Sequence, residues 1–524
     1  MIHNTNYCLL ALAALLVYSS CQKEDELILE GDFYQWEKLS IDFAGPMTVE
    51  NAEVNPFTDY RLEVDFKHAD TTISIGGFFA ADGQAAETSA DAGNIWRAHF
   101  RPPFAGDWSY TAVMYTGQDI VFASNTDLVG LSTILNEKGK FMVGEAKAAE
   151  RGRLVRNHPR YLQWSQSGEY FLKGGADSPE NLLAYYEFDG TYRYEAADRE
   201  GESQATKEFL HRFAPHAQDY RPDSPTWQGG KGKNLFGGLR YLADKGVNSI
   251  YFLTMNIGGD GKDVWPYTNH EERLRFDCSK LDQWERVFDY ADDDLGMMLH
   301  FVTQETENEL LLDGGHTERE RTLYYRELIA RFGHHRAVTW NLGEENGPAD
   351  FSPNGQTSVQ QAAMASWIKK HDPYQNYLVV HTHASQKYRD SVITPLIGNA
   401  DLDGLSLQID HISTVHETTK SWLKKSNEVS VPWIATVDET GPWWLGLDHD
   451  TKSPYNNQDS SRAFVLWGNL MAGGAGVEWY FGARNPENDL GCEDWRSRDN
   501  AWEWTKYGLD FFRNYHPYLE KEKH

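Results

Sequence analysis

Two glutamates stand directly after short apolar runs, where the end of a β-strand would present them to a substrate. Glu345 lies in Trp340 to Asn346 (WNLGEEN), and Glu439 lies in Pro432 to Gly441 (PWIATVDETG). A pair of carboxyl groups can cleave a glycosidic bond, one as nucleophile and the other as proton donor and then base. The sequence therefore predicts this chemistry at Glu345 and Glu439, with a carbohydrate as substrate and no cofactor.

Polar and aromatic side chains follow the other apolar runs in the same way, and we expect them to line a substrate site. Sugars offer hydroxyl groups to polar side chains and flat apolar faces to aromatic rings. The candidate substrate-binding residues are Asp177, Glu180, Asn181, Asn256, Trp265, Glu305, Glu344, Asn346, His381, His383, Gln408, Trp443 and Trp479.

The elements that must position these residues are short apolar runs, which alternate with amphipathic stretches from Tyr170 onward. One amphipathic stretch, Glu318 to Phe332, is predicted as a helix. Such alternation favours a (β/α)8 barrel, whose active site lies at the carboxyl ends of the strands. A doubly wound open sheet competes, but no G-x-G-x-x-G turn follows the first run. The predicted strands are Tyr170–Lys173, Ser249–Leu253, Met297–Phe301, Ala337–Asn341, Tyr377–Val380, Gly404–Leu407, Pro432–Thr436 and Gly476–Tyr480.

The region before the barrel has a different pattern. Runs such as Tyr60 to Phe66 alternate polar and apolar residues, and turn signals separate them, which is typical of a β-sandwich. We therefore predict an all-β sandwich over residues 32–135, a linker or barrel cap over 136–160, and a catalytic (β/α)8 barrel over 161–520. The acidic run Asp292 to Asp294 precedes a predicted strand and is interpreted as a solvated helix end.

The first 21 residues are predicted to be a targeting segment. Leu9 to Val17 is apolar but too short to span a bilayer, and Ser19, Ser20 and Cys21 follow it. This pattern resembles a bacterial lipoprotein signal, in which Cys21 would be lipidated. We expect the protein to be exported, either to the periplasm or to the cell surface as an outer-membrane-anchored protein. Contact with the membrane is expected only through that lipid.

Charge and cysteine content narrow the classes of partner. Acidic residues number 78 against 49 basic ones, and the net charge of -29 argues against nucleic acid as a partner. Cys278 and Cys492 could pair in an exported protein, or could be two unpaired core residues. The 18 Trp and 27 Tyr fit either large aromatic cores or sugar-stacking platforms.

Both glutamate segments resemble motifs of glycoside hydrolase clan A. WNLGEEN is similar to the strand-four motif, in which an Asn-Glu pair follows a Trp and a Gly, and this implies Glu345 as the acid/base. Glu344 stands where the motif has Asn, so the choice between Glu344 and Glu345 stays open. PWIATVDETG is similar to the strand-seven motif and implies Glu439 as the nucleophile of a retaining mechanism.

Two further stretches narrow the resemblance. Lys173 to Asn181 (KGGADSPEN) and Arg331 to His335 (RFGHH) look like a group of bacterial glycoside hydrolases known mainly from genomes. Members of that group carry an N-terminal immunoglobulin-like domain of unknown function, which implies the same architecture over about residues 32–515.

Two other functional classes remain as alternatives. A non-catalytic glycan-binding surface protein would keep the aromatic residues but would not need the two glutamates. A metal-dependent hydrolase would use His381 and His383, which point to the same side of a strand. Because such pairs serve as ligands on the first strand of metal-dependent barrels and here lie on the fifth, no metal site is predicted.

Overall fold

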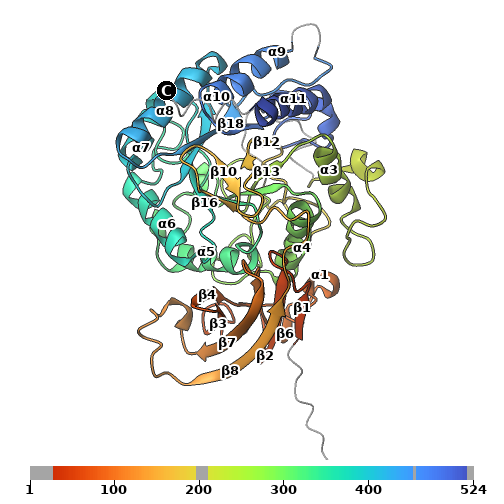
Figure 1. Ribbon diagram of the computed structural model, residues 1–524, viewed down its shortest axis with the longest axis vertical. Helices are drawn as coiled ribbons and strands as arrows, with labels where there is room; N and C mark the ends of the chain where they lie inside the picture. The colour runs from red at the N-terminus through yellow and green to blue at the C-terminus, as the bar shows by residue number, and fades with distance from the viewer. Residues whose placement is uncertain (1–27, 196–209, 453–455, 516–524) are drawn as a thin grey trace, which may run out of the picture.

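A computed structural model of the chain describes residues 28–195, 210–452 and 456–515 (Figure 1). An N-terminal β-sandwich is followed by a closed parallel barrel with helices around it, which confirms the predicted fold class. The predicted signal segment 1–21, with Cys21, lies outside the described residues. In the described part of the chain, no helix is long and apolar enough to cross a membrane.

The sandwich consists of two antiparallel sheets within residues 28–143. Its core forms because alternate strand residues point inward, and Phe66 stacks on Phe100 of the other sheet with ring centroids 4.0 Å apart. One sheet has the order β1 (Ile28–Gly31), β2 (Leu39–Val49), β6 (Ala92–Phe100), β5 (Phe78–Phe79). The other has the order β4 (Thr71–Gly76), β3 (Tyr60–His68), β7 (Gly106–Thr116), β8 (Thr133–Val143). Strand β8 therefore crosses the predicted boundary at residue 135.

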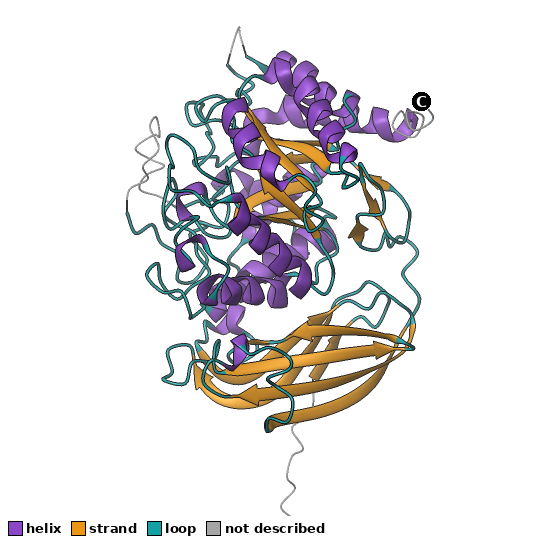
Figure 2. Cartoon of the chain, turned by 90° about the vertical axis from the view of Figure 1, so that its left-hand side faces the viewer, coloured by secondary structure: helices purple, strands orange, loops and turns teal. Residues whose placement is uncertain are grey.

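A small antiparallel sheet follows the sandwich in the sequence and precedes the barrel. It contains β9 (Leu154–Val155), β10 (Leu162–Trp164) and β11 (Tyr170–Phe171). The Leu154 N–H donates to the carbonyl of Arg336, just before a barrel strand, at 2.7 Å. This sheet therefore caps the amino ends of the barrel strands, at the right of the barrel in Figure 2.

The first barrel strand differs from the prediction. Tyr170 and Phe171 belong to the cap sheet, and the barrel strand β12 begins at Lys173. The strand was predicted too early in the sequence because Tyr170 to Leu172 is apolar, whereas β12 is rich in glycine. At Gly175 a Cβ would lie 2.8 Å from the Ser249 carbonyl oxygen, so the close strand contact requires glycine.

Within the described residues the barrel closes with eight parallel strands, and β12 pairs with β19 to complete the ring. The other predicted strands are confirmed to within a few residues. The strands are β12 (Lys173–Ala176), β13 (Ser249–Leu253), β14 (Met298–Val302), β15 (Val338–Asn341), β16 (Tyr377–His381), β17 (Gly404–Ile409), β18 (Ile434–Thr440) and β19 (Gly476–Trp479).

Helices cover the outside of the barrel, and a short one, α1 (Ala85–Thr88), belongs to the sandwich. The helix predicted over Glu318 to Phe332 is observed as α5 (Arg319–Phe332). The others are α3 (Lys233–Asp244), α4 (Cys278–Asp289), α6 (Ser358–His371), α7 (Gln386–Ile393), α8 (Val415–Glu428), α9 (Gln458–Ser460), α10 (Trp467–Met471) and α11 (Asp499–Tyr515). Cys278 and Cys492 are both buried and free, so the unpaired alternative is the correct one.

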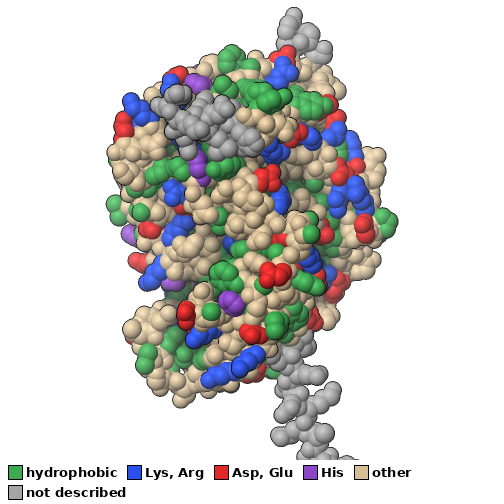
Figure 3. Space-filling view, in the orientation of Figure 1, with side chains coloured by type: hydrophobic (Ala, Val, Ile, Leu, Met, Phe, Trp, Pro, Cys, Tyr) green, Lys and Arg blue, Asp and Glu red, His purple; other side chains and the backbone are tan. Residues whose placement is uncertain are grey.

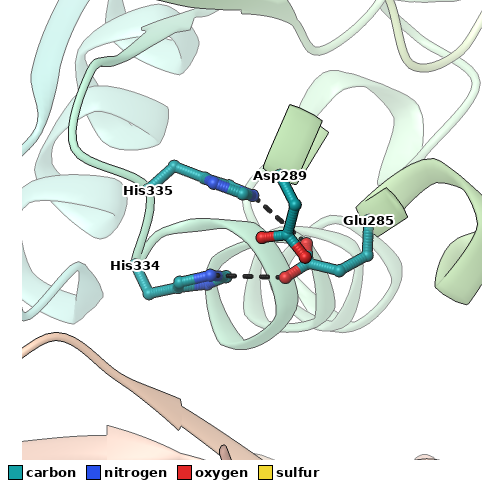
Figure 4. A group of neighbouring side chains, drawn as sticks. All are labelled: Glu285, Asp289, His334 and His335. Carbon is teal, nitrogen blue, oxygen red and sulfur yellow. Dashed lines mark hydrogen bonds and ion pairs between the residues drawn. The ribbon is translucent and has the colours of Figure 1, made fainter. Parts of the chain in front are cut away.

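The sandwich packs against α4 and α5 beside a largely buried group of carboxylate and histidine side chains (Figure 4). Glu285 and Asp289 lie on α4, and His334 and His335 follow α5. His335 Nε2 lies 3.2 Å from Glu285 Oε2. Lys38 of the sandwich reaches into this group, with its Nζ 2.7 Å from Asp289 Oδ2. Charge pairing therefore joins the two domains.

The run Asp292 to Asp294 adjoins the same interface. Its interpretation as a solvated helix end is wrong for Asp292, whereas Asp293 and Asp294 are exposed. Asp292 is fully buried, and its carboxylate accepts the Arg336 N–H at 2.8 Å. Arg101 of the sandwich donates to both oxygens of Asp293 at 2.7 Å. The sandwich therefore contributes a charge partner to Asp293, which the local sequence does not encode.

Candidate active site

Glu345 and Glu439 reach the same end of the barrel from strands β15 and β18. Glu345 lies four residues beyond the end of β15, and Glu439 is the penultimate residue of β18. The Glu439 residue is 4% exposed, whereas the Glu345 side chain is 17% exposed. Beside Glu439, strand β17 contributes Gln408, which pairs with it in register after a bulge.

His381, at the end of β16, connects the two glutamate segments. Its Nδ1 accepts the backbone N–H of Glu345 at 2.9 Å. Its Nε2 lies 3.9 Å from Glu439 Oε2. The buried imidazole of His381 thus contacts both candidate catalytic segments. The sequence had assigned His381 to substrate binding only.

His383 faces the other carboxylate. Its Nε2 lies 2.9 Å from the carbonyl oxygen of Gly347, which can only accept, so Nε2 carries the proton. Its Nδ1 lies 4.0 Å from Glu345 Oε2. Burial lowers the pKa of His383 to about 4 and, with His300 and His383 nearby, lowers that of His381 well below its usual range. Both rings are therefore neutral near pH 7.

The backbone around Glu344 is fixed by the preceding barrel loop. The Glu344 N–H donates to the Gln304 carbonyl at 2.9 Å, and Thr306 donates its hydroxyl to the Glu344 carbonyl at 3.2 Å. Glu344 itself is buried, at 6% exposure. Asn346 exchanges backbone and side-chain hydrogen bonds with His381, so it holds the loop to β16.

Tyr251 is a site residue that the sequence did not predict, and several acidic groups surround it. Its phenol is fully buried on β13, and its ring contacts His381 with centroids 6.3 Å apart. Burial, followed by the charges of Glu344 and Asp177, raises the pKa of Tyr251 well above its usual range. Asp177 is also buried, and burial with the carboxylates of Asp489 and Glu439 raises its pKa well above normal. These shifts place the predicted residues Asp177, Glu344 and Glu439 in one acidic environment.

Three predicted binding residues are instead committed to the protein itself. Asn256 donates to Asp263 Oδ1 at 3.0 Å and accepts two backbone N–H groups. Asn181 donates to the other oxygen of Asp263 and also bonds His211. Trp265 is 1% exposed and packs against Tyr192. These residues shape the loops around the site and offer little surface to a ligand.

The two predicted tryptophans differ. Trp443, after β18, is half-buried, and the Arg484 guanidinium lies 5.3 Å from its ring centroid. Trp479 is fully buried, donates its indole N–H to Thr505 of α11 and packs against Trp504. Because Trp479 points out of the barrel toward α11, its assignment to substrate binding is wrong, whereas Trp443 can present a face to a sugar.

A buried charge network inside the barrel was also missed. The Lys173 ammonium lies 3.0 Å from both Asp438 Oδ1 and Glu478 Oε2, and 3.3 Å from His300 Nδ1. His300 in turn accepts a hydrogen bond from Asn341 at 3.0 Å. The signal was present, because a charged residue within a strand that is buried on both faces needs a partner inside the barrel.

Comparisons with known proteins agree with this architecture. Residues 32–115 match a domain of unknown function (DUF5060). A solved structure from Bacteroides vulgatus, provisionally described as a glycoside hydrolase, superposes with a TM-score of 0.58 at 15% identity, over 93% of this chain and 79% of that chain. The expected resemblance, a domain of unknown function before a barrel of this kind, is therefore confirmed at the level of the fold.

Other solved structures are less similar. A family 5 glycoside hydrolase from Bacteroides vulgatus has a TM-score of 0.42 at 15% identity, covering 69% of this chain and 72% of that chain. An endoglucanase from Pseudomonas stutzeri, in complex with cellobiose, has a TM-score of 0.36 at 13% identity, covering 64% of this chain and 95% of that chain. No curated protein matches the chain.

Proposed function

We propose that the protein is a retaining glycoside hydrolase in which Glu439 is the nucleophile and Glu345 the acid/base. Glu439 would attack the anomeric carbon while the protonated Glu345 gives its proton to the leaving oxygen. Glu345 would then activate water to release the sugar from Glu439. Export, lipidation at Cys21 and a polysaccharide or oligosaccharide substrate remain parts of the same proposal.

The contacts of the two histidines carry this assignment. Because Nδ1 of the neutral His381 accepts a hydrogen bond, its proton is on Nε2, which faces Glu439. An N–H aimed at a carboxyl group favours the ionised form, which a nucleophile requires. His383 also carries its proton on Nε2, but that nitrogen donates to Gly347, and the lone pair of Nδ1 faces Glu345. A lone pair favours the protonated carboxyl group, which an acid requires.

Both separations, 3.9 and 4.0 Å, exceed a hydrogen bond and would shorten when substrate closes the site. The same contacts disfavour the metal-dependent alternative. The Nδ1 of His381 and the Nε2 of His383 are each used by a backbone group, and their other nitrogens face different glutamates. The two rings therefore do not offer a shared pair of ligand atoms.

Replacement of Glu439 tests the nucleophile. Glu439→Ala removes the atom that forms the covalent intermediate, so turnover of a confirmed glycan substrate should fall by far more than about a hundredfold. Azide should partly restore activity and give a glycosyl azide of inverted configuration. A product of retained configuration, or activity near wild type, would contradict the role of Glu439.

Replacement of Glu345 tests the acid. Glu345→Ala should retain cleavage of dinitrophenyl glycosides, whose leaving group needs no proton, and lose activity on natural glycosides. Azide should speed the second step with retained configuration. Glu344→Ala is the matched control: if it shows this leaving-group pattern and Glu345→Ala does not, Glu344 is the acid. If neither change reduces activity by about a hundredfold, the two-carboxylate mechanism is wrong.

A further inference from the structure

Three carboxylates converge beside the candidate active site, from loops that follow three neighbouring barrel strands. They belong to Glu180 after β12, Asp260 after β13 and Glu305 after β14, and one oxygen of each lies within 4.8 Å of the others. The Asp260 N–H donates to Glu305 Oε1 at 2.8 Å. Gly259, at a φ of +88°, allows this approach, because a Cβ there would lie 2.6 Å from oxygens of both Glu305 and Glu307.

The second oxygen of Glu305 points to a ligand. Glu305 is 3% exposed, and its Oε2 is buried without a hydrogen-bond partner among the described residues. Burial, followed by the like charges of Asp260, Glu307 and Glu180, raises the pKa of Glu305 well above its usual range. A buried carboxylate in such surroundings requires either a proton or a cation.

We propose that Glu180, Asp260 and Glu305 form a calcium-binding site at the mouth of the barrel. All three ligands are carboxylate oxygens, which hard cations prefer, whereas zinc favours nitrogen and sulfur. Two oxygens bound to one Ca²⁺ at its usual distances can lie up to about 4.6–5.2 Å apart, which accommodates this group. Mg²⁺ demands near-ideal octahedral geometry at about 2.0–2.1 Å and usually keeps several waters, so a group of three protein carboxylates suits Ca²⁺ better.

The site would support the catalytic segment through its neighbours in sequence. Gln304 and Thr306, on either side of Glu305, hold the backbone of Glu344 by the two hydrogen bonds described above. A cation that fixes Glu305 would therefore fix the loop against which Glu344 and Glu345 rest. Binding itself is independent of the proposed glycosidase activity, because it is measured without substrate.

Calcium titration of the chelator-treated full chain tests the proposal. Calorimetry should show one equivalent of Ca²⁺ bound, and the melting temperature should rise in a saturable manner as CaCl2 is added. Glu305→Gln, which keeps the shape and removes the charge, should weaken Ca²⁺ binding by at least about tenfold, the lower end for a disturbed metal site. The matched control is Glu417→Gln on α8, whose side chain is 76% exposed and should leave binding unchanged.

Three outcomes would overturn the site. Absence of binding heat, together with a melting temperature unaffected by Ca²⁺ or chelator, would mean that a proton neutralises Glu305, and Glu305→Gln would then be at least as stable as wild type. Equal calcium affinity of Glu305→Gln and wild type would place the ion elsewhere. Tighter binding of Mg²⁺ than of Ca²⁺ would contradict the choice of cation.

Discussion

The backbone of Glu345 lies in the left-handed region, with a φ of +41°, which residues other than glycine rarely adopt. Such strain is concentrated at functional sites, because the surrounding structure maintains it. The hydrogen bond from the Glu345 N–H to His381 is one contact that does so. The strain is invisible in the sequence, since WNLGEEN predicts the position of the glutamate but not its backbone conformation.

This conformation predicts how two replacements differ. Glu345→Gly should be more stable than Glu345→Ala by about 1 kcal/mol, because glycine adopts a positive φ without a Cβ clash. Urea unfolding of both variants measures the difference. Glu344 does not have a positive φ, and there the order should reverse, with the glycine variant the weaker one. If Glu345→Ala is at least as stable as Glu345→Gly, the backbone of Glu345 is not strained.

His383 predicts a change in the pH profile of activity. If its Nδ1 lone pair favours the protonated Glu345 carboxyl group, His383→Ala should make that group lose its proton more readily. The alkaline limb of kcat/KM should then move to lower pH by roughly one unit, as expected when a hydrogen-bond partner of an acid is lost. A pH series on a confirmed substrate measures this shift. An unchanged limb, or a shift to higher pH, would remove His383 from the assignment of the acid.

At the scale of elements, the sequence predicts where a strand lies better than which way its side chains point. Ser249 to Leu253 was predicted at its observed bounds, because a run buried on both faces is simply apolar. The same property hides orientation in β19, where Glu478 points into the barrel and Trp479 points out toward α11. The choice between these two faces depends on the positions of the neighbouring strands, which a single strand does not encode.

The interior charge network predicts a large cost for the loss of its cation. Lys173→Met leaves the buried carboxylates of Asp438 and Glu478 without their ammonium partner, which should reduce the free energy of unfolding by roughly 3–5 kcal/mol. Denaturant unfolding measures the loss, and adding Glu478→Gln to Lys173→Met should recover part of it. As a control, Lys424→Met on α8, where the lysine side chain is 76% exposed, should change stability by less than about 0.5 kcal/mol. Equal effects of the two lysine replacements would contradict the network.

At the scale of the whole molecule, the sequence predicted both domains but not how they meet. Arg101 and Asp293 are 192 positions apart, and nothing in either segment indicates that they pair. Charged side chains of both signs are interspersed over the face shown in Figure 3. Because charged residues usually lie at such a surface, the sequence favoured an exposed helix end for Asp292 to Asp294. Which surface charges pair across the interface is therefore known only from the docked arrangement of the two domains.

The interface between the domains predicts that stability falls as the pH rises. Burial alone would lower the pKa of His335, but the carboxylates of Glu285 and Asp292 outweigh it and raise the pKa to about 9. Burial, aided by Asp277, raises the pKa of Glu50 of the sandwich to about 8. The folded protein therefore holds both protons more tightly than the unfolded chain does. The stabilisation from His335 is complete below about pH 6.5 and is lost as the pH rises through 9.

Denaturant unfolding across this range should show a decrease in the free energy of unfolding on the order of 3 kcal/mol from His335 alone. His335→Gln cannot take up the proton, so its stability should depend less on pH between about 6.5 and 9. Glu50→Gln should flatten the curve at lower pH, because the proton on Glu50 begins to matter above about pH 4.5. His411→Gln, at an exposed histidine of the barrel, should keep the wild-type slope. If His335→Gln keeps that slope as well, the docking of the sandwich does not depend on a charged His335, and the two domains are held together chiefly by their other contacts, such as the pairing of Arg101 with Asp293.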